Sequence, residues 1–198
     1  MQKAANKFQT PDEYLDVEVA SEHKSEYYKG EIFAMTAASV NHNRIAGNLF
    51  AQINSSLQNS QCEVFISDLR IWIEAVELFT YPDLVIVCNR LQLYKDRNDT
   101  ITNPFIIFEI LSESTKNYDR GNKFEFYRSL SSFQEYVLVD QSKDHIEHFF
   151  LEPEKHWIFK EYNNGSDTLQ LSKINFQMTL SDIYRRVVFD TDQETTLR

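Results

Sequence analysis

The sequence predicts an α/β protein with a central mixed β-sheet, flanked by helices and followed by a mainly β C-terminal section. Short β-branched and aromatic runs, typical of strands buried on both faces, alternate with helical periodicity through most of the chain. The end of the chain carries hairpin signals instead. A length of 198 residues with 42% hydrophobic residues suits one buried core. We therefore expect a single domain over residues 1–190 and a polar tail over 191–198.

The N-terminal elements are defined by their start signals. Thr10 stands before a proline and two acids, a capped-helix pattern that predicts a helix over residues 11–19. Gly30 leads into an apolar run over 31–35, which is typical of a strand. Asn41 is the expected N-cap of a second helix, because an apolar stripe with a residue at every fourth position follows it. The stripe consists of Ile45, Leu49, Ile53 and Leu57.

The central sheet is expected from three strand candidates over residues 63–73, 81–88 and 105–111, which polar or turn-like segments separate. A helical stretch follows over 116–130 and another strand over 135–140. Because strand–helix–strand connections are short and right-handed, the last two strands should lie side by side and parallel.

The C-terminal section is expected to contain a hairpin, with strands over residues 145–150 and 156–162 joined by a proline turn. A short helix over 180–188 would close the fold.

Composition limits the possible functions. The apolar runs end too soon to cross a bilayer, and the N-terminus lacks the apolar core of a secretory signal. A formal net charge of −10 opposes broad nucleic-acid binding, so any contact with DNA must be local. Only Cys62 and Cys88 are present, and without a CxxC pair they are expected to be core thiols of a cytoplasmic protein.

Two carboxylates stand inside strongly apolar runs, Asp83 within residues 81–87 and Glu109 within 105–111. An ionised carboxylate in a buried strand is costly unless it is paired or bound to a metal. Two of them on one sheet indicate a divalent cation, Mg²⁺ or Mn²⁺, which could bridge a phosphate and activate water for phosphodiester hydrolysis. Lys123 could neutralise charge on the phosphate.

Several short motifs accompany these residues. They are Glu26–Met35 (EYYKGEIFAM), Ala38–Asn43 (ASVNHN), Ser67–Arg70 (SDLR), Tyr81–Val85 (YPDLV), Asn103–Pro104, Phe108–Ser112 (FEILS) with Ser114–Thr115, and Tyr118–Lys123 (YDRGNK). Together they resemble the Uma-two family of restriction endonucleases, within the PD-(D/E)XK nuclease superfamily, over most of the chain. The resemblance implies the restriction-endonuclease-like fold, metal ligation by Asp83 and Glu109, and a contribution from Glu31.

The sequence departs from the basic superfamily pattern at one position. The lysine expected two residues after the acidic ligand is Leu111. The family resemblance suggests that the lysine has migrated onto the following helix, which makes Lys123 the natural candidate. Lys116 and Arg120 are spaced so that they could share its helical face, and the sequence leaves open which of the three reaches the metal.

Each of these residues also has a purely structural explanation. Asp83 could cap a turn at the end of a strand, and Glu109 could be satisfied by an arginine or a tyrosine without metal. Glu31 alone is typical of a solvated strand entrance, and Lys123 alone is typical of a helix surface.

Four residues are predicted to support the site rather than to carry its chemistry. His42 lies at the start of a predicted helix, where a capping neighbour is the favoured explanation over a general base. Asp68 and Arg70 could line the site or pair with each other. Arg120 is the fourth.

We expect a Mg²⁺-dependent endonuclease acting on DNA, and a homodimer would be the simplest way to cut both strands. Two alternatives stay open. A catalytically silent interaction module that keeps the nuclease fold is favoured by the net charge of −10 and the displaced lysine. A metal-dependent hydrolase of small phosphoesters would use the same ligands without a basic groove.

Overall fold

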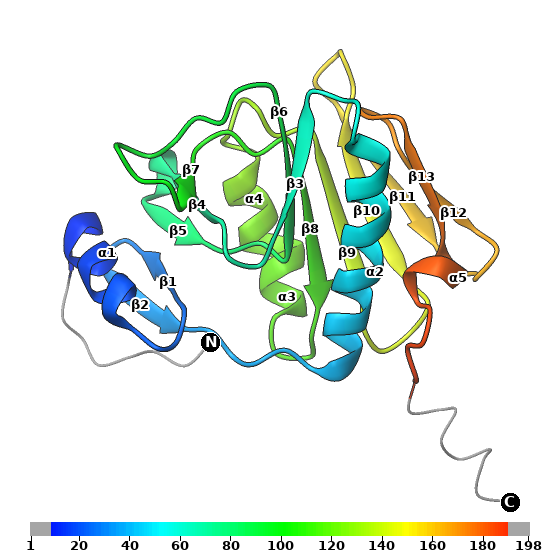
Figure 1. Ribbon diagram of the computed structural model, residues 1–198, viewed down its shortest axis with the longest axis horizontal. Helices are drawn as coiled ribbons and strands as arrows, with labels where there is room; N and C mark the ends of the chain where they lie inside the picture. The colour runs from blue at the N-terminus through cyan, green and yellow to red at the C-terminus, as the bar shows by residue number, and fades with distance from the viewer. Residues whose placement is uncertain (1–8, 190–198) are drawn as a thin grey trace, which may run out of the picture.

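A computed structural model describes residues 9–189. The fold consists of a five-stranded and a six-stranded sheet, packed with helices, and a small two-stranded sheet (Figure 1). The first sheet has the strand order β2-β1-β5-β4-β7. Its strands are β1 Ser25–Tyr28, β2 Glu31–Ala34, β4 Arg70–Ile73, β5 Leu78–Thr80 and β7 Thr100–Ile101. Helix α1 (Pro11–Ala20) covers it and begins with a capping box between Thr10 and Glu13, as the sequence predicts.

The second sheet has the order β11-β10-β9-β8-β6-β3 and is mixed, as predicted. Its strands are β3 Cys62–Ile66, β6 Leu84–Cys88, β8 Ile106–Leu111, β9 Glu135–Asp140, β10 Ile146–Leu151 and β11 Trp157–Tyr162. Strands β8 and β9 are parallel, which confirms the predicted crossover, and the other neighbours in this sheet are antiparallel.

Helices cover both faces of the second sheet (Figure 1). Helix α2 (Val40–Leu57) buries the predicted apolar stripe on one face, but its N-cap is Ser39 rather than Asn41. The Ser39 hydroxyl accepts the backbone N–H of His42, three residues on, and so fixes the helix start. The opposite face carries the segment predicted as one helix over 116–130. It is divided into α3 (Lys116–Tyr118), a π-helical turn η2 (Asp119–Lys123) and α4 (Phe124–Tyr127).

The predicted strand over residues 63–73 is wrong as a single element. It divides into β3 and β4, which belong to different sheets. Ser67 adopts a positive φ of 60° between them, and its N–H donates to the Asp83 carbonyl. The turn thereby carries the chain from one sheet to the other, which a periodicity argument within one strand does not reveal.

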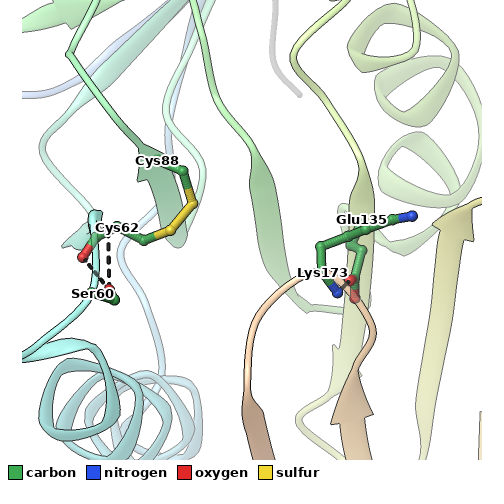
Figure 2. The surroundings of a disulfide bond; sticks show 5 residues. All are labelled: Ser60, Cys62, Cys88, Glu135 and Lys173. Atoms are coloured by element: carbon green, nitrogen blue, oxygen red, sulfur yellow. Dashed lines mark hydrogen bonds between the residues drawn. A yellow bond between two sulfur atoms is a disulfide. The ribbon is translucent and has the colours of Figure 1, made fainter.

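Several short elements complete the fold. They are the 3₁₀ turn η1 (Glu74–Val76), the hairpin β12 Thr168–Leu171 and β13 Phe176–Thr179, and α5 Leu180–Ile183, which is shorter than the predicted helix over 180–188. The hairpin is held to β9 by Glu135, whose carboxylate accepts the Lys173 N–H at 2.6 Å (Figure 2). The same carboxylate accepts the Ser172 hydroxyl at 2.9 Å. The predicted tail over 191–198 lies outside the described residues. Within residues 9–189, no helix combines the length and apolar character needed to span a membrane.

The prediction that both cysteines are free thiols is wrong. Cys62 and Cys88 are directly opposite each other on the antiparallel pair β3 and β6 and form a disulfide (Figure 2). The two positions are 26 residues apart. Pairing depends on the register of two strands, which the cysteine count does not contain.

Reduction of this disulfide should lower the stability of the protein. Opening a loop closed over 26 residues restores conformational entropy to the unfolded chain, and the expected loss is about 3 kcal/mol. Urea unfolding with and without a reductant measures it. The Cys62→Ser, Cys88→Ser double variant should not respond to the reductant, and two titratable thiols in the unreduced native protein would contradict the pairing.

Candidate active site

A buried lysine joins three carboxylates between the two sheets. The Lys123 Nζ lies 2.9 Å from Glu109 Oε1, 3.6 Å from Glu26 Oε1 and 3.6 Å from Asp119 Oδ1. All four side chains are 4–6% exposed. Buried charges are stable only when they are paired, so each member of this cluster depends on the others.

Different parts of the fold supply these groups. Glu26 comes from β1 in the first sheet and Glu109 from β8 in the second, while Asp119 and Lys123 stand at the two ends of the π-helical turn. π-helical turns are rare and recur at functional sites. Here the turn brings two residues four apart onto the same buried side, in contact with both sheets.

Hydroxyl groups complete the cluster. The Tyr127 hydroxyl donates to Glu109 Oε1 at 2.9 Å, and the Thr80 hydroxyl donates to Glu26 Oε1. The Tyr136 hydroxyl donates to the backbone carbonyl of Asp119 at 3.0 Å, which holds the π-helical turn against β9. The carboxylates are therefore oriented by fixed donors as well as by charge.

The pKa values in the cluster follow from burial and from neighbouring charge. Burial raises the pKa of Glu109 to about 8, against the opposing effect of Lys123. Burial also raises the pKa of Asp119. Burial alone would lower the pKa of Lys123, but the surrounding acids, Glu109 foremost, outweigh it and hold that pKa well above its ordinary value. Lys123 is therefore a cation throughout the physiological range.

Asp83 stands at the edge of this cluster. Leu84 pairs with Phe108 in the antiparallel ladder, so the next step in the register sets Asp83 opposite Glu109. Asp83 Oδ2 accepts the Ile110 N–H at 2.7 Å, and Oδ1 lies 3.1 Å from His42 Nε2. With 22% of its side chain exposed, Asp83 is open to solvent where Glu109 is not.

His42 connects α2 to this carboxylate. Its backbone lies in the first helical turn, as predicted, and its ring reaches Asp83 from the α2 face of the sheet. His42 therefore has two roles: its backbone N–H is capped by Ser39, and its imidazole orients the Asp83 carboxylate.

The remaining predicted residues lie further out. Arg120 donates to Glu147 of β10 at 2.7 Å, and Lys116 pairs with Glu113 at 2.8 Å, so Lys123 is the basic residue of the three that is paired with Glu109. Asp68 and Arg70 do not form the predicted mutual pair. Asp68 pairs with Lys24, and Arg70 pairs with Asp99 at 3.0 Å.

Sequence reasoning missed Glu26, Asp119 and Tyr127. The hairpin carboxylate paired with Lys123 is Glu26, whereas Glu31 stands at the start of β2 opposite Tyr28, and its role stays a prediction. Asp119 stands four residues before Lys123, a spacing that favours contact on a helix. Glu26 lies in the same motif as Glu31, but its burial depends on a strand, β1, that the sequence analysis did not predict.

Within the part of the chain that the structure describes, no group of three or more His, Cys, Asp or Glu is arranged to hold a metal ion. Asp83, directly before β6, and Glu109 in β8 are neighbouring carboxylates, since Asp83 Oδ2 accepts the N–H of Ile110, the residue after Glu109. Such a pair supplies at most two protein ligands of one hard cation, which leaves the rest of a coordination shell to water and substrate.

Known proteins similar to this chain point to one family. Residues 11–181 match the family model Uma2, described as "Putative restriction endonuclease". Two proteins of Synechocystis sp. are similar over most of their length. "Uncharacterized protein sll1609" is 34% identical over 85% of this chain and 96% of its own, and "Uncharacterized protein slr1290" is 35% identical over 91% and 93%. A solved structure from Anabaena variabilis, described as "a putative nuclease belonging to DUF820", has a TM-score of 0.71 at 18% identity, over 89% of this chain and 98% of that one.

Replacing Lys123 by methionine should destabilise the protein strongly. Lys123→Met leaves Glu26, Asp119 and, once it has lost its proton, Glu109 without their cation, and breaking a buried pair in this way costs about 3–5 kcal/mol. The loss should grow with rising pH, because the carboxyl groups then lose their protons. Urea unfolding measures it, with Lys116→Met as the matched control, since that pair is exposed and worth about 1 kcal/mol or less. Equal small losses in both variants would show that Lys123 does not hold the cluster together.

Proposed function

The chain belongs to the Uma2 family, and from this premise we propose that it is a metal-dependent endonuclease that hydrolyses phosphodiester bonds of DNA. The observation that carries the proposal is the Lys123 ammonium 2.9 Å from Glu109, with Asp83 beside this strand: Asp83 Oδ2 accepts the N–H of Ile110, the residue after Glu109. A pair of carboxylates beside a fixed cation combines hard oxygen ligands with a charge that can stabilise a phosphate.

The donor set fits Mg²⁺ or Mn²⁺. Both ligands are carboxylates, and Mg²⁺ is commonly held by one or two carboxylates together with water and substrate phosphates. In this proposal Asp83 and Glu109 hold the ion. When bound, the ion supplies Lewis-acid neutralisation of the anionic phosphodiester and lowers the pKa of water.

The surrounding residues fix the two carboxylates. His42 and the Ile110 N–H take one oxygen of Asp83 each, and the Tyr127 hydroxyl takes Glu109 Oε1. Partners of this kind set the orientation and basicity of metal-binding carboxylates. The site is therefore pre-organised by β6, β8, α2 and α4 before any ligand binds.

Lys123 acts in this proposal as a charge stabiliser rather than as a base. Its raised pKa keeps the ammonium protonated, so it has no free electron pair with which to take a proton from water. It supplies from η2 the positive charge that Leu111 cannot supply from β8. Glu26 and Asp119 keep it charged and positioned.

DNA as the substrate and a homodimer are parts of the proposal that rest on the family and on the reaction, and a cytoplasmic location is a separate part of it. Cutting both strands is simplest with two related sites. The disulfide between Cys62 and Cys88 bears on the location, because thiols of the cytoplasm are normally kept reduced. Alkylation of the protein in intact cells, before lysis, reports whether the pair is oxidised there.

Asparagine at position 83 should abolish metal-dependent cleavage. Asp83→Asn keeps the shape of the side chain and removes its charge, so we expect a loss of at least about 100-fold. His42→Ala should lose about 10- to 100-fold, because it removes a partner that orients Asp83. The assay follows supercoiled plasmid and single-stranded DNA in Mg²⁺ and in Mn²⁺.

The exposed Glu125→Gln variant, purified identically, controls for contaminating nucleases. Equal cleavage by the wild type and Asp83→Asn, or none by either, would favour the catalytically silent module. Hydrolysis of a small phosphodiester without cleavage of any polymer would favour the phosphoesterase.

Binding of Mg²⁺ should release a proton at neutral pH. Glu109, with a pKa of about 8 in the metal-free protein, holds its proton at pH 7 and must lose it to bind the ion, so about one proton should appear per ion. The affinity should rise as the pH increases to about 8 and then level off. Calorimetry in two buffers with different ionisation enthalpies measures the release. Glu109→Gln should not show it, and identical heats in both buffers for the wild type would contradict the assignment.

A further inference from the structure

A partly exposed lysine is linked to Asp83 through the backbone of Ser67. The Lys24 Nζ donates to the Ser67 carbonyl at 3.0 Å, and the Ser67 N–H donates to the Asp83 carbonyl at 2.9 Å. The ammonium is thus separated from the backbone of Asp83 by a single residue. The ammonium contacts the β3–β4 turn, and Ser67 of this turn is hydrogen bonded to the backbone of Asp83, the more exposed of the two proposed metal ligands.

Lys24 has contacts in addition to its ion-pair partner. Its ammonium lies 5.5 Å from the centroid of the Tyr81 ring, and Tyr81 is a buried residue two positions before Asp83. A ring face and a carbonyl together hold a cation in place even when a carboxylate leaves.

The partner, by contrast, is solvated. Lys24 is ion paired with Asp68, whose side chain is 82% exposed, while that of Lys24 is 41% exposed. Ion pairs as exposed as this contribute little to stability, so exchange of the carboxylate for another anion is inexpensive. The Lys24 ammonium is held by the Ser67 carbonyl and the Tyr81 ring, and its Asp68 partner can be replaced, so it is suited to bind a phosphate.

We propose that Lys24 binds a backbone phosphate of the nucleic acid beside the cleavage site, and that Asp68 is the counter-ion which this phosphate displaces. The inference rests on the proposed function, because it takes Asp83 as part of the site. It explains how a chain with a net charge of −10 offers a local contact to a polyanion. Asp68 then weakens binding of every phosphate chain, since it competes for the same ammonium.

A second exposed pair provides a matched control. Lys95 is ion paired with Asp12, lies 5.1 Å from the centroid of the Tyr94 ring and is 54% exposed. Lys24→Gln and Lys95→Gln change the net charge equally, as do Asp68→Asn and Asp12→Asn. Any difference within each pair of variants therefore reports position rather than overall charge.

The test is fluorescence anisotropy of two labelled duplex oligonucleotides of unrelated sequence, in EDTA and in Ca²⁺, at 50 and 200 mM salt. Lys24→Gln should weaken binding several-fold on both sequences at low salt. The defect should shrink about threefold at the higher salt, because one phosphate contact is lost. Asp68→Asn should strengthen binding, while Lys95→Gln and Asp12→Asn should stay close to the wild type.

Three results would overturn the proposal. They are equal weakening by Lys24→Gln and Lys95→Gln, no gain from Asp68→Asn beyond that of Asp12→Asn, and no binding of duplex by the wild type. Competition with inorganic phosphate tests whether Lys24 prefers a nucleic acid to free phosphate. Displacement of the duplex only at phosphate concentrations far above those of the duplex phosphates supports the proposal. Binding of free phosphate as tight as that of the duplex contradicts it.

These outcomes are independent of cleavage. Lys24-dependent binding without metal-dependent cutting would keep the phosphate contact of Lys24 and remove the nuclease. Metal-dependent cutting with the same KM in Lys24→Gln and in the wild type would support the nuclease and contradict the phosphate contact of Lys24.

Discussion

The burial of one ammonium among three carboxylates is the constraint on which the junction of the two sheets depends. Lys123 is 6% exposed, and a cation so buried is stable only with its acids in place. Those acids come from β1, β8 and the π-helical turn, so neither sheet can shift against the other without leaving a charge unpaired. The residues proposed to carry chemistry are thus the same residues that hold the fold together at this point.

The sequence predicts the parts of this arrangement that are encoded locally. Short-range patterns predict strand β6, which follows Asp83, strand β8, which contains Glu109, and the apolar stripe of α2. The handedness of the crossover predicts the parallel pair of β8 and β9. Lys123 was predicted from the family resemblance, and the structure pairs it with Glu109. A cost argument about charges in apolar strands was sufficient to find the two carboxylates.

The rest depends on contacts between distant segments. The choice between Glu26 and Glu31 is decided by which face of a four-residue strand meets η2, and the pairing of Cys62 with Cys88 is decided by the register of β3 and β6. Local periodicity contains neither piece of information. The same holds for Asp68, because the turn at Ser67 removes it from the strand alternation and places it beside Lys24.

The solvent exposure of the charged residues decreases from the edge of the site to its interior. This arrangement bears on how an acidic protein can bind a polyanion. The side chains of Lys24 and Asp83 are 41% and 22% exposed, whereas Glu109 and Lys123 are buried. Lys123 offsets one of the interior charges, and burial keeps Glu109 protonated at neutral pH, so part of the acidic charge is removed before a phosphate arrives, and enclosure shields what remains. The charges of Lys24 and Asp68 at the β3–β4 turn then decide how a nucleic acid approaches the site. The net charge of −10 suppresses unspecific contact elsewhere on the surface, while affinity at this edge is set by the exchange of one carboxylate for one phosphate on Lys24.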